Sequence, residues 1–442
     1  MSIFKLKEHN TTPMREMVAG LTTFTTMSYI VVVNPAILAN AGIPVGPSFV
    51  ATVLAAVFGC LLMALYANRP FAIAPYMGEN AFIAFTVCRL LGYSWQTALA
   101  AIFIAGALFI LMTVLRLRQW LVEAVPMSLR FSFAVGIGLF LTFIGLNQAG
   151  IVALGVPGAP VRAGNITTAP VLVALLGFVL LAVLIIRKVP GAILLGIVLT
   201  AIVAFVTRTA AAPVHLLSMP PSLNPILWQL DFRGALTWHA FPIVLTIFIM
   251  AFVDTMGTLI GLSARAGFLD DKGNLPQIER PMLVDALSTC VAPALGTTTA
   301  GAFVESATGI EAGGRTGLTA LTTAACFALT LFFSPFVASI PAQAYAPALI
   351  MVGLFMLAPI VRIDFSDYSE SIPAFAVVTL MCFTFNIAMG ITAGFVLYPL
   401  CKLAAGQDKR SQAGAAGADR AVVVVLCLLS VWIGSQSQDQ KS

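Results

Sequence analysis

The chain has 442 residues, of which 60% are hydrophobic and 9% charged, and its mean hydropathy is +0.99. A soluble domain carries about 25% charged residues, so this chain lacks the polar surface to face water on all sides. Its net charge of +5 is too weak to indicate a nucleic-acid-binding protein. Composition therefore predicts a polytopic membrane protein with the lipid bilayer as its solvent.

Apolar runs divide the chain into two similar halves, judged against the roughly 20 residues that a helix needs to cross a bilayer. The first set of runs covers residues 17–39, 48–67, 71–91, 95–115, 127–147, 169–187 and 190–207. A second set, after a polar stretch, covers 240–262, 281–295, 297–312, 316–334, 343–360, 372–385 and 387–403. We therefore predict an all-α protein with 14 transmembrane segments, and a short interfacial segment at 421–434.

Basic residues fix the predicted orientation, because Lys and Arg favour cytoplasmic loops. With a cytoplasmic N-terminus at residues 1–16, the outer loops hold Arg89, Arg162, Arg208 and Arg233. The other Lys and Arg residues as far as Arg420 then lie in inner loops. The tail at 404–442 is accordingly predicted to be cytoplasmic.

Two units of seven segments enter the membrane in opposite senses, as in the inverted repeats of many secondary transporters. The predicted repeats are 17–207 and 240–403, joined by an extracytoplasmic linker at 208–239. Two sequence echoes support this division: residues 134–140 resemble 350–355, and residues 78–81 resemble 304–307.

Four carboxylates fall inside apolar runs, namely Glu79, Asp254, Asp285 and Glu305. An acid at bilayer depth costs ~2.5–3.5 kcal/mol, so each needs a partner, a proton or an aqueous cavity. No Lys or Arg lies in the middle of a span, which favours protonation linked to substrate occupancy. The alternative is a structural role: Glu79 could cap its own helix, and for Asp285 we favour the structural interpretation.

The third and tenth segments are predicted to be half extended and half helical. Pro70 and Pro75 precede Glu79, and threonines between glycines at 296–301 precede Glu305. A pair of interrupted segments at corresponding positions of two repeats is the best sequence indication of a binding site at the membrane midplane.

The sequence gives little support to an enzyme, a metalloprotein or a channel. It holds no CxxC pair, and the cysteines lie mostly in apolar runs, as small buried hydrophobes do. His9, His215 and His239 lie outside the spans or at their edges. The glycines at 309–317 lack the ending of a phosphate-binding loop. We expect no cofactor and no metal.

Three motifs resemble the AzgA-like purine permeases, a branch of the nucleobase–ascorbate transporter family. They are Ala19–Pro35 in the first span, Phe252–Leu259 in the eighth, and Phe303–Thr319 in and after the tenth. The similarity extends from about Arg15 to about Lys402. The resemblance implies a 7+7 inverted repeat with core and gate domains, dimerisation through the gate domain, and proton-coupled uptake of adenine, guanine or hypoxanthine.

By this resemblance the substrate-binding residues are Asp254, Glu305 and Asn80, with Glu79, Ser306 and Thr258 beside them. Asp254, Glu305 and Glu79 are the candidates for proton coupling. Many members of the branch have leucine at the position of Glu79, so this acid could alter purine preference or coupling. Uracil-transporting relatives carry histidine where Thr258 stands, which excludes a histidine-based proton relay here.

The sequence leaves open which purine is preferred, whether protons or sodium drive transport, and the oligomeric state. A transporter of the same fold for uracil, xanthine or another small neutral or anionic solute is the alternative. Two acidic site residues would repel an anion but would accept the N–H groups of a neutral base, for which Phe303 or Phe82 could supply a stacking surface.

Overall fold

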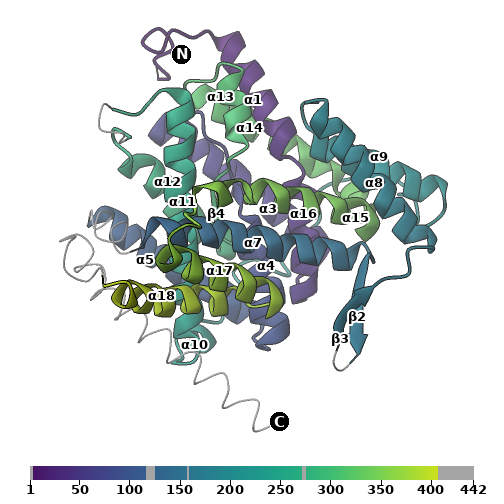
Figure 1. Ribbon diagram of the computed structural model, residues 1–442. Helices are drawn as coiled ribbons and strands as arrows, with labels where there is room; N and C mark the ends of the chain where they lie inside the picture. The colour runs from purple at the N-terminus through teal and green to yellow at the C-terminus, as the bar shows by residue number, and fades with distance from the viewer. Residues whose placement is uncertain (1–2, 116–124, 157–158, 271–274, 407–442) are drawn as a thin grey trace.

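The computed structural model describes residues 3–115, 125–156, 159–270 and 275–406, and within them the chain is mainly helical (Figure 1). The first half contains α1 (Pro13–Met27), α2 (Ile30–Leu38), η1 (Ala39–Ala41), α3 (Val45–Leu62), η2 (Met63–Ala67), β1 (Ile73–Pro75), α4 (Met77–Ala81), η3 (Phe82–Leu90), α5 (Trp95–Val114), α7 (Met127–Gln148), β2 (Val152–Val156), β3 (Ala159–Ala163), α8 (Ala169–Ile186) and α9 (Ala192–Val206).

The second half contains α10 (Phe232–Ala235), α11 (Phe241–Ala266), α12 (Glu279–Leu295), β4 (Ala300–Ala302), α13 (Ser306–Glu311), α14 (Gly317–Thr330), η4 (Leu331–Phe333), α15 (Ser334–Ser339), α16 (Ala342–Met356), η5 (Ala358–Arg362), α17 (Tyr368–Phe383) and α18 (Ile387–Ala404). The hairpin of β2 and β3 projects from the helical body beside α8 (Figure 1).

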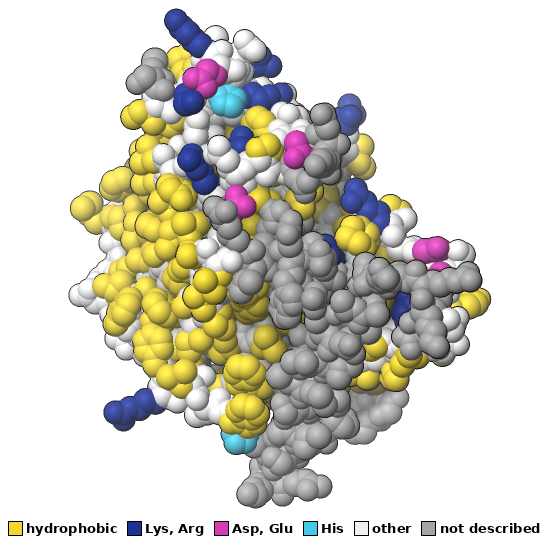
Figure 2. Space-filling view, turned by 90° about the vertical axis from the view of Figure 1, so that its left-hand side faces the viewer, with side chains coloured by type: hydrophobic (Ala, Val, Ile, Leu, Met, Phe, Trp, Pro, Cys, Tyr) yellow, Lys and Arg dark blue, Asp and Glu magenta, His cyan; other side chains and the backbone are white. Residues whose placement is uncertain are grey.

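Every apolar run predicted before residue 404 coincides with a helix or with a strand followed by a short helix. Among the described residues, nine helical stretches are long and apolar enough to cross a bilayer, and α9 and α17 are shorter apolar helices. Apolar side chains cover the middle of one face, with Lys and Arg gathered at the end that carries the N-terminus (Figure 2). The chain is a multi-pass membrane protein; the count of 14 crossings stays a prediction, and the run at 421–434 lies outside the described residues.

Helix packing supports the inverted repeat, because exchanging each helix for its counterpart in the other unit turns one observed contact into another. Packing of α5 on α12 corresponds to packing of α14 on α3, and α7 on α17 corresponds to α16 on α8. The pair α8 and α9 likewise corresponds to α17 and α18. The helices thereby form two groups, a core of α1–α5 with α11–α14 and a gate of α7–α9 with α16–α18.

The gate is held together where α7 crosses α16 (Figure 1). A Cβ on Gly138 would lie 2.8 Å from the Gly353 carbonyl oxygen, and a Cβ on Gly353 would collide with the Gly138 carbonyl oxygen and with Thr142. These two glycines occupy equivalent places in the echo between 134–140 and 350–355. Because only a hydrogen fits at this crossing, the two helices pack backbone against backbone.

The two predicted half-extended segments meet as a two-stranded antiparallel sheet. Ile73 pairs with Ala302, Ala74 with Gly301, and Pro75 with Ala300. Immediately afterwards α4 begins at Met77 and α13 at Ser306. The prediction that each segment turns helical near its glutamate is therefore confirmed.

A fifth acid, Glu16, fastens the N-terminal helix to the second repeat. Its side chain is fully buried and accepts hydrogen bonds from the backbone N–H groups of Arg315 (3.0 Å) and Thr316 (3.2 Å). The Thr319 hydroxyl donates a third bond at 2.6 Å. These contacts explain why the glycine-rich segment at 309–317 turns back against α1. In this turn Gly313 adopts a φ of +105° beside Arg15.

Replacing Glu16 with alanine leaves the three donors without their acceptor, which costs about 1–3 kcal/mol for each buried group left unsatisfied. We expect Glu16→Ala to lower the melting temperature of the detergent-purified protein by several degrees. The matched control is Glu8→Ala, because Glu8 forms an exposed ion pair with Lys5 and such pairs contribute ~0–1 kcal/mol. Equal melting temperatures for Glu16→Ala and Glu8→Ala would contradict this role.

Candidate functional site

Hydrogen bonds on both sides of the β1–β4 pair join the two half-extended segments and include the predicted site residue Ser306. Beyond the strands, the Phe303 N–H donates to the Ala72 carbonyl (2.9 Å) and the Tyr76 N–H donates to the Thr299 carbonyl (3.0 Å). The Ser306 hydroxyl accepts a bond from the Ala72 N–H at 2.9 Å. Ser306 is thus fully buried and joins the two segments, while Glu305 lies immediately before α13.

Glu305 is half-buried and is held by a tyrosine from the first helix pair. The Tyr29 hydroxyl donates to Oε1 of Glu305 at 2.6 Å, and the Tyr29 side chain is 1% exposed. A second contact between the same segments joins the hydroxyls of Thr26 and Thr308 at 3.0 Å. Val304, the neighbour of Glu305, is 64% exposed, so this turn borders open space.

Asp254 lies on the one open face of α11. Along this helix the half-buried Asp254 is followed by exposed Gly257, Ile260, Gly261 and Arg265 at helical spacing. A Cβ on Gly257 or Gly261 would find no heavy atom of the described residues within 4 Å. The first half of α11, residues 242–252, is by contrast almost entirely buried.

The open face of α11 is too polar and too poor in bulky side chains for contact with lipid alone, since it holds an acid, two glycines and an arginine. Val304 and Glu305 lie immediately before α13, and α13 packs against α11. The surface made of these two residues and the open face of α11 is what we call the central cleft. The cleft runs from Asp254 to the end of α11, where Arg265 pairs with Glu311 at 2.6 Å. Thr258, in contrast, is buried on the packed side of the helix.

Glu79 is 1% exposed, and no hydrogen-bond donor from another described residue reaches either of its carboxyl oxygens. It therefore does not cap α4. α4, which carries Glu79, contacts α11, which carries Asp254. When two carboxyl groups lie near each other away from water, the state in which both are ionised is unfavourable.

Asp285 connects α12 to both half-extended segments. Its Oδ2 accepts bonds from the Ala302 N–H (3.1 Å) and the Tyr76 hydroxyl (3.4 Å), and it is fully buried. The same hydroxyl lies 3.4 Å from the Thr255 hydroxyl, one residue beyond Asp254. These bonds agree with the structural interpretation of Asp285, which holds the β4 backbone and the Tyr76 side chain together.

Asn80 is fully buried in a polar network. Its amide donates to the side-chain carbonyl of Asn34 and accepts from the hydroxyl of Thr298. Asn34 donates in turn to Thr52 (2.6 Å) and Thr297 (2.8 Å). The network joins α2, α3, α4 and the segment before β4, so Asn80 holds these elements together. Its predicted contact with substrate stays a prediction.

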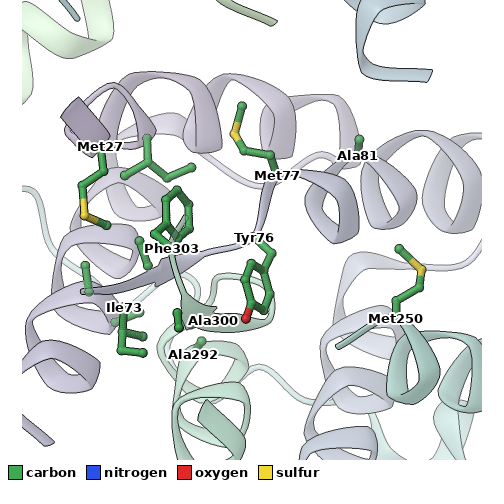
Figure 3. Packing of buried hydrophobic residues seen from close by; sticks show 14 of the residues in the cluster. Met27, Ile73, Tyr76, Met77, Ala81, Met250, Ala292, Ala300 and Phe303 are labelled. Carbon is green, nitrogen blue, oxygen red and sulfur yellow. The ribbon is translucent and has the colours of Figure 1, made fainter. Parts of the chain in front are cut away.

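Two buried aromatic rings, one from each half-extended segment, lie against each other. Tyr76 and Phe303 stack with their planes 6° from parallel and their centroids 6.3 Å apart. Figure 3 shows both rings among buried apolar residues, with Tyr76 reaching towards Ala300 and Ala292. Phe82 is completely buried and is not exposed to the cleft.

Sequence analysis missed Tyr29, Tyr76 and Glu16 as partners of the site and its support. Tyrosines in apolar runs were the available signal, because a buried phenol needs a hydrogen-bond partner and acids are the strongest acceptors in a membrane. Their pairing with acids far away in the chain could not be inferred without the fold.

Comparison with known proteins decides the family. A family model described as a permease family matches residues 14–393. The chain belongs to the nucleobase–ascorbate transporter family.

Relatives in this family match over nearly their whole length. A putative permease of Methanocaldococcus jannaschii is 43% identical, with 92% of this chain and 93% of the relative covered. The guanine/hypoxanthine permease PbuO of Bacillus subtilis is 42% identical (92% and 95%). The adenine permease AdeP of Escherichia coli is 39% identical (92% and 91%).

Among solved structures, the fold resembles the transmembrane domain of the cyanobacterial bicarbonate transporter BicA, with a TM-score of 0.65. The alignment covers 86% of this chain and 96% of that domain at 16% identity. At this identity the match shows the family fold and says nothing of the cargo.

Accessibility of the central cleft can be tested with cysteine. We expect Gly257→Cys to react with a membrane-impermeant maleimide in purified protein well above the background of the native cysteines, because a Cβ there meets open space. Thr258→Cys is the matched control, since the next residue faces the packed side of α11. Equal labelling of the two variants would contradict the cleft.

Proposed function

We propose that the chain imports purine nucleobases and holds the base in the central cleft between Asp254 and Glu305. The observation that supports this proposal is that Asp254 and Glu305 are both half-buried, on α11 and at the start of the adjacent α13, in a permease-family protein. Relatives that align over more than nine-tenths of their length are named adenine and guanine/hypoxanthine permeases, which supports purines as the cargo.

The chemistry of the cleft suits a flat, neutral base. A purine presents N–H donors at its edges, and a carboxylate accepts such bonds with a net gain of ~1.5–3 kcal/mol each. An anionic solute would meet repulsion from Asp254 and Glu305. Phe303 lies two residues before Glu305 and stacks on Tyr76, so apolar side chains pack next to the proposed site.

In this proposal Asn80, Ser306 and Thr258 hold the elements that carry Asp254 and Glu305 in place. Asn80 and Ser306 hold the half-extended segments in place through the bonds described above, and Thr258 packs one turn beyond Asp254. These positions orient Glu305 and Asp254 rather than touching the base.

We further propose that transport is coupled to protons, with Glu79 as part of the proton-binding group. A carboxylate deep in the membrane with no donor and a second acid nearby is unfavourable unless one of them is protonated. Binding of a proton would make the loaded carrier neutral enough to reorient, and release of the proton would accompany release of the base.

With the N-terminus in the cytoplasm, as the basic residues predict, the cleft opens inward. It reaches the end of α11 marked by Arg265, while the outer half of the same helix is packed. We therefore assign the structure to the inward-open state of an alternating-access cycle, with release of the base on the cytoplasmic side.

The direct test is uptake of radiolabelled adenine, hypoxanthine and guanine by proteoliposomes, with unlabelled uracil, xanthine and ascorbate as competitors. We expect purines to be transported and the competitors to inhibit weakly. Glu305→Gln should reduce purine affinity at least tenfold, because a charge-assisted bond is lost. Glu311→Gln, on the exposed ion pair, is the matched control and should retain transport. If Glu305→Gln binds purines with wild-type affinity, Glu305 does not contact the base.

Proton coupling makes a separate prediction for Glu79. An inward proton gradient should drive purine accumulation, and a protonophore should abolish it. Glu79→Gln should lose most of this gradient-driven accumulation yet keep exchange of labelled for unlabelled base, which requires no net proton movement. Full accumulation by Glu79→Gln under the same gradient would show that Glu79 is not needed for proton coupling. If the wild-type protein accumulates purine in response to a sodium gradient and not to a proton gradient, proton coupling itself is wrong.

A further inference from the structure

The contact between Tyr29 and Glu305 limits how Glu305 can bind a ligand. A free carboxylate has two oxygens side by side and can take a pair of parallel N–H donors. Here Oε1 already accepts the Tyr29 hydroxyl at 2.6 Å. No donor from another described residue is bonded to Oε2, which leaves this oxygen for a ligand in the central cleft.

Tyr29 is fixed in place well enough to impose this limit. It lies at the break between α1 and α2 and is 1% exposed, so water does not compete for its hydroxyl. Its helix pair is tied to α13 by the bond between Thr26 and Thr308 and by packing of α1 on α13. The phenol and the carboxyl group therefore lie on elements that are joined independently of their own hydrogen bond.

We propose that Tyr29 sets the purine preference of the site by occupying one oxygen of Glu305. The inference rests on the proposed purine transport. Guanine presents two adjacent donors, N1–H and the 2-amino group, which match a carboxylate with both oxygens free. Hypoxanthine presents N1–H alone on the same edge. The Tyr29 hydroxyl takes one of the two lone pairs of Oε1 and draws charge from it, so a second donor gains less from Oε1 than from a free oxygen. The N1–H bond to Oε2 is available to both bases, whereas the 2-amino group of guanine meets only the weakened Oε1.

The wild-type protein therefore binds hypoxanthine more tightly than guanine. Because the preference depends on N1–H, 1-methylhypoxanthine binds poorly. Both statements can be checked by competition against labelled hypoxanthine uptake in proteoliposomes, without any variant. A wild-type protein that prefers guanine, or that binds 1-methylhypoxanthine as well as hypoxanthine, overturns the proposal.

The decisive variant is Tyr29→Phe, which keeps the ring and removes only the hydroxyl. We expect the ratio of the guanine to the hypoxanthine inhibition constant to fall about tenfold, the effect of one additional hydrogen bond to guanine. Tyr398→Phe is the matched control, because Tyr398 donates a similar bond to Glu370 at 3.0 Å in the gate. This control should leave the ratio unchanged.

The outcomes separate this inference from the proposed function. An unchanged ratio in Tyr29→Phe, or an equal loss for both bases, would mean that Tyr29 only supports the fold, and would overturn the proposal while purine transport stands. Failure of the wild-type protein to transport any purine would instead overturn the proposed function and this inference with it. The thermal shift of purified Tyr29→Phe with each base gives the same ratio where uptake is too slow to measure.

Discussion

The site depends on the pairing of two short extended segments in the middle of a helical membrane protein. Backbone N–H and C=O groups cannot be left without partners in lipid, so helices and closed barrels are the usual solutions. Here β1 and β4 satisfy each other, with one strand from each repeat and the two running antiparallel. Phe303 and Glu305 follow from one strand and Tyr76 and Glu79 from the other, so this pairing fixes the relation between the acids and the rings.

Most of the fold could be predicted from the sequence, because a bilayer imposes simple rules on composition. The apolar runs and the half-extended segments before Glu79 and Glu305 follow from hydropathy and from proline and glycine placement, and the structure agrees with them. The count of seven plus seven crossings rests on the same rules and stays a prediction. Membership of the family was likewise predicted from the motifs at 19–35, 252–259 and 303–319.

Side-chain direction was the part that the sequence could not supply. Glu79 and Asn80 are adjacent at the start of a short helix, yet one faces Asp254 without a donor and the other bonds to Asn34 and Thr298. Each direction depends on which helices pack against α4, and these come from distant parts of the chain. The same holds for Tyr29 and Glu305, which are 276 residues apart, and for Glu16, whose partners lie in the second repeat.

The uneven burial of α11 bears on the kind of movement that carries a solute across. Residues 242–252 are packed over several turns, so the barrier on that side is a thick layer of interlocked helices and not a thin plug. Rotation of one or two side chains cannot breach a seal of this depth. Access from the opposite side requires displacement of the helix together with its neighbours as a rigid body.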